Sequence, residues 1–128
     1  MDEKDLREDN YLRVSLQSGQ GRAIIKKITI NDIVRIKSGD YGSYNYAPVP
    51  ITKDLLNENC GAINESIKLK ANCELFIGVK EEGHNYANDG KAVLYVHGTP
   101  IYTMDCEYLH ELQNIFRYLS GKELEINL

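Results

Sequence analysis

The stretch YLRVSLQSGQGRAIIKKITI, residues 11–30, carries the pattern on which the fold class depends. Apolar residues at the even positions from 12 to 16 alternate with more polar residues at the odd positions, which is the period of a half-buried strand. The GQG triplet at 19–21 is a turn signal, and the β-branched run over 22–30 predicts a second strand. The stretch therefore predicts an antiparallel hairpin with one face in water.

Working outward, the rest of the chain predicts further strands and two helices. We expect a short strand at 33–36, a loop at 38–50, a helix of about two turns capped by Thr52, strands at 66–71, 73–79, 92–97 and 101–104, and a turn at Gly98–Pro100. Apolar residues at steps of three and four predict a last helix from about Cys106 to Leu119, with Asp105 as its N-cap and Gly121 as its stop. The tail at 122–128 alternates weakly, which is compatible with an edge strand.

This order predicts a single α+β domain over residues 1–128, with a mostly antiparallel sheet, a short central helix and a C-terminal amphipathic helix. A small barrel is an alternative form of its N-terminal part. The length of 128 residues fits one domain, and 42% hydrophobic with 27% charged residues is an ordinary globular composition.

Charge and cysteine content narrow the classes of function. A net charge of −4 argues against a nucleic-acid partner recognised by bulk charge. No apolar run reaches the roughly 20 residues of a membrane-spanning helix, and the charged start has no secretory signal pattern. An odd count of three cysteines without such a signal predicts reduced thiols, and therefore a cytoplasmic protein.

Residues 108–124, YLHELQNIFRYLSGKEL, resemble the tail YVHQLQNLYFALTGEEL of a family of small uncharacterised proteins of Bacteroidetes, their prophages and their phages. Residues 5–12 are similar to the family's opening LRxGNYV, and residues 46–61 to its central PIPLTEEWL…GF. The chain departs from the family at Glu111, where the family has glutamine, and in lacking tryptophan and an aromatic residue after Gly61. The resemblance implies a bacterial or phage cytoplasmic protein and brings no activity with it.

The first candidate binding feature is a loop with three tyrosines, Tyr41, Tyr44 and Tyr46. Tyrosine offers rigid apolar area with a polar tip, which is why it recurs in binding surfaces. The loop predicts either a recognition surface for a protein or a base-containing ligand, or tyrosines that pack back on the sheet.

A second candidate is the polar stripe of the last helix, formed by His110, Gln113, Asn114 and Arg117 at i, i+3, i+4 and i+7. These side chains could contact a ligand or partner, or could tie the helix to neighbouring backbone.

Catalytic signatures are sparse. The alternative to binding is a small hydrolase that uses His97 or His110 with Asp105 or Cys106. His84, His97 and His110 lack the local spacing of metal ligands, so we predict no metal and no cofactor.

The leading hypothesis is therefore a non-enzymatic binding module of a bacterium or phage. It would contact a host protein or a small nucleotide-like ligand, with counter-defence as one role. A purely structural homo-oligomer, assembled through the tyrosine loop or the 122–128 tail, is a third reading, and no membrane partner is expected.

Overall fold

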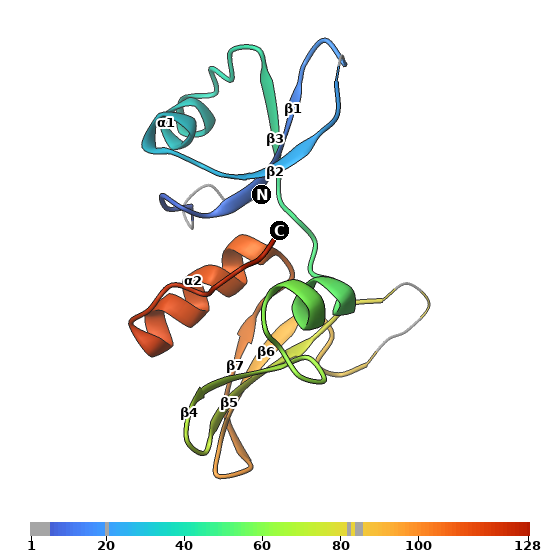
Figure 1. Cartoon of the computed structure of the whole chain (residues 1–128), viewed down its shortest axis with the longest axis vertical. Helices are drawn as coiled ribbons and strands as arrows, with labels where there is room; N and C mark the ends of the chain where they lie inside the picture. Colours follow the sequence, from blue (N-terminus) through green and yellow to red (C-terminus); the bar gives the residue numbers. More distant parts are fainter. Residues whose placement is uncertain (1–5, 20, 82, 84–85) are drawn as a thin grey trace. The chain divides into compact units, whose positions relative to one another are not determined.

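The computed structural model describes residues 6–19, 21–81, 83 and 86–128 (Figure 1). Two antiparallel sheets and a few helices confirm the α+β class. Contacts divide the chain into two compact units, Met1–Val49 with Tyr108–His110, and Pro50–Glu107 with Glu111–Leu128. The described residues form no closed barrel, so the N-terminal sheet is open. The single-domain assignment stays a prediction.

The first unit contains a three-stranded sheet in the order β2-β1-β3 (Figure 1). Strand β1 (Tyr11–Leu16) pairs with β2 (Ile24–Lys27), which confirms the predicted hairpin. The predicted second strand is shorter than expected, because Thr29 leaves it to cap the following helix.

Helix α1 (Ile30–Ser38) replaces the strand predicted at 33–36. Thr29 and Asp32 form a capping box, in which each side chain accepts a hydrogen bond from the other residue's backbone N–H. Ile33 and Ile36 are buried one helical turn apart, whereas Val34 is 58% exposed. The apolar residues therefore follow the helical period, and the short IVRI run was too brief to separate that period from a strand.

Strand β3 (Tyr44–Ala47) lies inside the segment predicted as a loop. It pairs with the opposite edge of β1, with Tyr46 facing Val14 and Tyr44 facing Leu16. The Gly, Ser and Pro content of 38–50 concealed it, because pairing to an existing strand overrides a weak local preference. The tyrosine loop is therefore partly a strand.

The second unit opens with a short π-type helix, η2 (Leu55–Asn59). Thr52 Oγ1 accepts a hydrogen bond from the backbone N–H of Leu55 at 3.0 Å, the capping contact that the sequence predicts.

A four-stranded antiparallel meander, β4-β5-β6-β7, follows η2 (Figure 1). Its strands are β4 (Ser66–Lys70), β5 (Cys73–Gly78), β6 (Lys91–Val96) and β7 (Thr99–Asp105). All four coincide with predicted strands to within two residues at each end. Leu75, Ile77 and Ala92 are buried on one face of this sheet.

Helix α2 (Leu109–Ser120) begins three residues later than predicted. Asp105 is not its N-cap, because it is the last residue of β7 and forms an ion pair with Lys91. Instead, the Glu111 carboxylate accepts a hydrogen bond from the backbone N–H of Glu107 at 3.0 Å. This contact gives a partner to a backbone N–H group just before the first turn of α2. Among the described residues, neither α2 nor any other helix is long and apolar enough to cross a bilayer.

The tail at 122–128 forms no strand, so the edge strand that the sequence suggested there is a wrong prediction. Leu124 is buried, and the backbone N–H of Asn127 donates to the carbonyl of Asn59 at 2.8 Å. The tail therefore runs back to the end of η2 rather than along a sheet edge.

Candidate functional site

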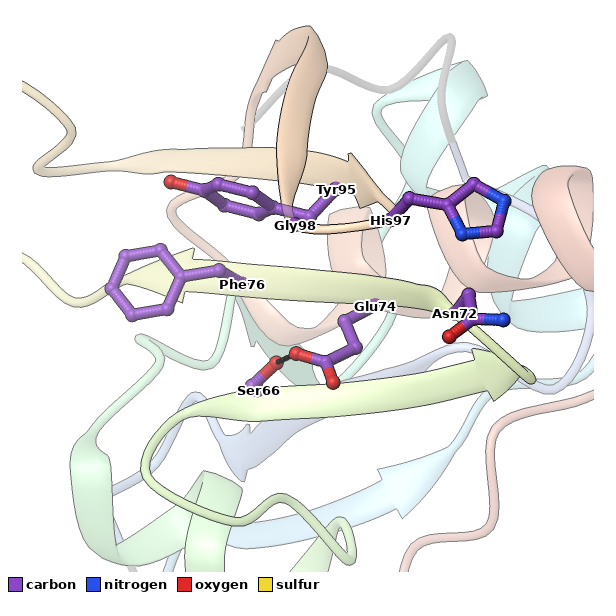
Figure 2. Close-up of a pocket in the computed structure, with 7 residues that line it drawn as sticks. All are labelled: Ser66, Asn72, Glu74, Phe76, Tyr95, His97 and Gly98. Carbon is purple, nitrogen blue, oxygen red and sulfur yellow. Dashed lines mark hydrogen bonds between the residues drawn. The ribbon is translucent and has the colours of Figure 1, made fainter.

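A groove lies on the second sheet and has a volume of about 370 Å³. Alternation along β5 buries Leu75 and Ile77 on one face and leaves Glu74 and Phe76 on the other. The groove occupies this second, outer face. Its lining residues are Ser66, Asn72, Glu74, Phe76, Tyr95, His97 and Gly98 (Figure 2).

Two tight turns form one end of the groove. Asn72 closes the β4–β5 hairpin at φ 64°, and His97 begins the β6–β7 turn at φ 51°. The backbone N–H of His97 donates to the carbonyl of Asn72 at 2.8 Å, which ties the two turns together. Asn72 and His97 therefore stand at the same end of the groove, on backbone that is fixed by hairpin geometry (Figure 2).

Two aromatic rings form the other end of the groove. Figure 2 shows Phe76 and Tyr95 projecting in the same direction from neighbouring strands. Tyr95 pairs with Glu74 in the register, so Phe76 and Tyr95 are diagonal neighbours, with Cα atoms about 7–8 Å apart. The two half-buried rings therefore offer aromatic surface on which a flat ligand could stack.

The middle of the groove is polar. Ser66 donates its hydroxyl hydrogen to Glu74 Oε2 at 3.2 Å, which leaves the carboxylate able to accept further hydrogen bonds. Lys68 stands directly opposite Glu74 in the register. No lysine or arginine lines the groove itself, so it suits a neutral ligand with N–H donors better than a phosphate.

The three tyrosines of the predicted recognition loop lie in the first unit. Tyr41 and Tyr46 pack against the buried cluster of Leu6, Leu12, Ile28, Ile33 and Ile36. Tyr44 is 38% exposed, with the Arg35 guanidinium 5.8 Å from its ring centroid. Two of the three tyrosines thus serve packing, and only Tyr44 presents a substantial surface.

Tyr46 is held by a buried carboxylate. Its hydroxyl donates to Asp32 Oδ1 at 2.7 Å, and the Lys26 ammonium lies 3.6 Å from Oδ2. Burial alone would raise the pKa of Asp32, but hydrogen bonds from Thr29 and Tyr46 outweigh it and leave the pKa below its ordinary value. Burial and the bond to Asp32 raise the pKa of Tyr46.

The stripe on α2 divides into buried and exposed members. His110 and Gln113 are buried, and the His110 ring stacks on Tyr108 with centroids 6.0 Å apart. Asn114 is half-buried. Arg117 is exposed, donates to the carbonyl of Gly121 and lies 3.9 Å from Glu123, so it stabilises the end of the helix. A ligand role for this stripe stays a prediction.

The hydrolase candidates are not assembled within the second unit. His97 and Asp105 lie at opposite ends of the β6–β7 hairpin, separated along β7 by about 20 Å. Cys106 is buried, and burial raises the pKa of its thiol, which disfavours the nucleophilic thiolate. His110 belongs to the first unit.

Among residues 6–19, 21–81, 83 and 86–128, no three His, Cys, Asp or Glu side chains are grouped so as to hold a metal ion. His84 lies outside the described residues.

Sequence reasoning singled out His97 but missed the other lining residues of the groove. The signals were present in the two-residue connections Ala71-Asn72 and His97-Gly98, which are typical hairpin loops. Had both been read as hairpins, the meander and its alternating faces would have placed Glu74, Phe76 and Tyr95 together.

Comparison with known proteins adds no relative, because no family model, no curated protein and no solved structure matches the chain.

Proposed function

We propose that this chain is a non-enzymatic binding module that holds a nucleobase, or an aromatic heterocycle of similar size, on the outer face of its second sheet. The observation that carries this proposal is the placement of two aromatic side chains, Phe76 and Tyr95, as diagonal neighbours in the groove that also holds the Glu74 carboxylate. Stacking on aromatic side chains holds a base by its faces, and a carboxylate accepts hydrogen bonds from its N–H edge.

The lining residues also indicate which heterocycles should bind best. Glu74 accepts hydrogen bonds and cannot donate them when ionised, so it favours a base that presents adjacent N–H donors. Guanine does so, whereas uracil offers a single ring N–H. Asn72 and His97 at the other end can both donate and accept, which suits a sugar or a second polar substituent.

A hydrolase is less well supported, because His97 and Asp105 are far apart and the thiol of Cys106 is buried with a raised pKa. If the resemblance of residues 108–124 to the Bacteroidetes and phage family holds, the module is a bacterial or phage protein that acts inside a bacterial cell. A protein partner at Tyr44 is the alternative within the binding class.

The test is an NMR titration of the isotope-labelled protein with guanosine, adenosine, cytidine and uridine. The chemical shifts of the backbone amides report where each nucleoside binds. We expect saturable shifts at β5, β6 and the two turns, with guanosine tightest. Phe76→Ala and Tyr95→Ala should each weaken guanosine binding by roughly 5- to 150-fold, which corresponds to about 1–3 kcal/mol of stacking per base.

The matched control is Tyr102→Ala, which removes a tyrosine of β7 that is 62% exposed and does not line the groove. It should bind guanosine like the unaltered protein. Glu74→Gln should reduce the preference for guanosine over uridine without abolishing binding. Absence of shifts with all four nucleosides, or equal losses in Tyr95→Ala and Tyr102→Ala, would overturn the proposal.

A further inference from the structure

A second groove lies between the opposite face of the same sheet and helix α2, with a volume of about 510 Å³. Its walls are half-buried apolar side chains from both elements, with Leu94 and Val96 on β6 and Phe116 and Leu119 on α2. A volume of this size falls within the usual range for small-molecule sites.

The charge at this groove has one sign. Lys70 and Lys122 are its only charged lining residues, and neither forms an ion pair with a described residue. An apolar trough with two ammonium groups is complementary to a ligand with an apolar body and an anionic end.

Lys70 faces this groove because β4 is irregular. Strict alternation would place Lys68 and Lys70 on the same face. The register instead shifts between them, so that Lys68 faces Glu74 whereas Lys70 faces Cys73. Leu69 and Lys70 therefore both line the α2 side, although they are consecutive. Bulges are common next to active sites, where they redirect a side chain.

From these observations we infer that the groove between β4–β6 and α2 binds a free single-chain amphiphile with an anionic head, such as a fatty-acid carboxylate. The chain lies against Leu94, Val96 and Phe116, and the head meets Lys70 and Lys122. This site is on the other face of the sheet from the proposed nucleobase groove and does not depend on it.

The first experiment measures affinity by calorimetry for octanoate, decanoate and dodecanoate, each below its micelle concentration. Affinity should rise about fourfold per methylene until the groove is filled, as expected for apolar burial. Dodecyltrimethylammonium, with the same chain and a cationic head, should bind at least tenfold more weakly than dodecanoate. Equal affinity for the two dodecyl compounds would overturn the inference.

The second experiment removes the head contacts. The double variant Lys70→Met, Lys122→Met keeps the apolar stems and should weaken dodecanoate about tenfold. Lys68→Met is the matched control, since Lys68 is on the same strand but the other face, and it should bind as the unaltered protein does. All three lysines are exposed, so folding should be preserved. An unchanged affinity in the double variant would refute the inference.

Cys73 provides a readout that does not depend on the lysines, because it lines this groove and is only half-buried, whereas Cys60 and Cys106 are buried. Saturating dodecanoate should slow the reaction of Cys73 with a thiol reagent, as read by peptide mass mapping, and guanosine should not. Labelling of Cys73 at the same rate with and without dodecanoate would place the amphiphile elsewhere. If the protein bound only phosphatidylglycerol vesicles and no monomeric carboxylate, the ligand would be a membrane surface and the inference would be wrong.

Discussion

Gly78→Ala is expected to lower the free energy of unfolding by about 3 kcal/mol, the upper range of overpacking substitutions. A Cβ at position 78 would stand 1.8 Å from the carbonyl oxygen of Asn88 and 2.6 Å from its carbonyl carbon. Both are backbone atoms of the turn that precedes β6, and the N–H of Gly90 in that turn donates to the carbonyl of Gly78 at 2.8 Å. The clash can therefore be relieved only by moving the turn off the strand, which breaks that hydrogen bond.

Gly121→Ala is the matched control for this prediction. Gly121 has φ 74°, and nothing lies within 4 Å of the Cβ that alanine would add. Its cost should be backbone strain alone, about 1 kcal/mol. Urea unfolding of both variants measures the difference. A Gly78→Ala variant no less stable than Gly121→Ala would mean that the turn is not seated on β5 in solution.

Asp32→Ala is expected to destabilise the protein by about 3 kcal/mol. Asp32 is only 2% exposed, and its carboxylate accepts hydrogen bonds from the Thr29 backbone N–H at 2.8 Å and from the Tyr46 hydroxyl at 2.7 Å. Its loss removes half of the capping box and leaves a partly buried hydroxyl without its acceptor, and these effects add to about this size. Tyr46→Phe should cost only about 1 kcal/mol, because Asp32 keeps its other partners.

The same carboxylate makes stability depend on pH in a defined direction. Because the pKa of Asp32 is lower in the folded state, its contribution is fully present above the ordinary aspartate pKa of about 3.9 and is lost as pH falls through the lowered value. Asp32→Asn should therefore lose less stability than the unaltered protein between pH 5 and pH 2, when both are followed by urea unfolding. Parallel losses over that window would show that Asp32 is not held ionised by the folded state.

The second sheet carries a groove on each of its two faces. Regular alternation along β5 sends Glu74 and Phe76 outward, and the bulge in β4 sends Lys70 toward α2. A protein that bound ligands on both faces could couple them through the strands that carry both sets of side chains. A titration of guanosine with and without dodecanoate measures that coupling directly.

The strands of the second unit could be predicted because each combines β-branched or aromatic residues with a clear turn at its end. The hairpin of β1 and β2 was predictable for the same reason. Helix α1 was predicted as a strand because its apolar run is short, whereas two other errors concern residues that pair with segments farther along the chain. Tyr44–Ala47 is a strand because β1 offers it an unpaired edge, and Asp105 ends β7 because Lys91 stands opposite it.

The candidate site was less predictable than the fold. Tyr41, Tyr44 and Tyr46 stood out because they cluster in sequence, yet Tyr41 and Tyr46 pack against the core of the first unit. Phe76 and Tyr95 come from strands almost twenty residues apart and carry no local motif. Only the register of β5 with β6 makes them neighbours.

The amino-acid sequence alone thus determined the α+β class, most strand positions and the amphipathic C-terminal helix, because each depends on the periodicity and turn residues of a short segment. The tertiary structure alone decided that β3 pairs with the free edge of β1, which face of the second sheet carries aromatic rings beside a carboxylate, and which face carries Lys70. Those outcomes depend on register and, for Lys70, on the bulge in β4. A shift of one residue reverses every side chain of a strand, and local composition does not encode that shift.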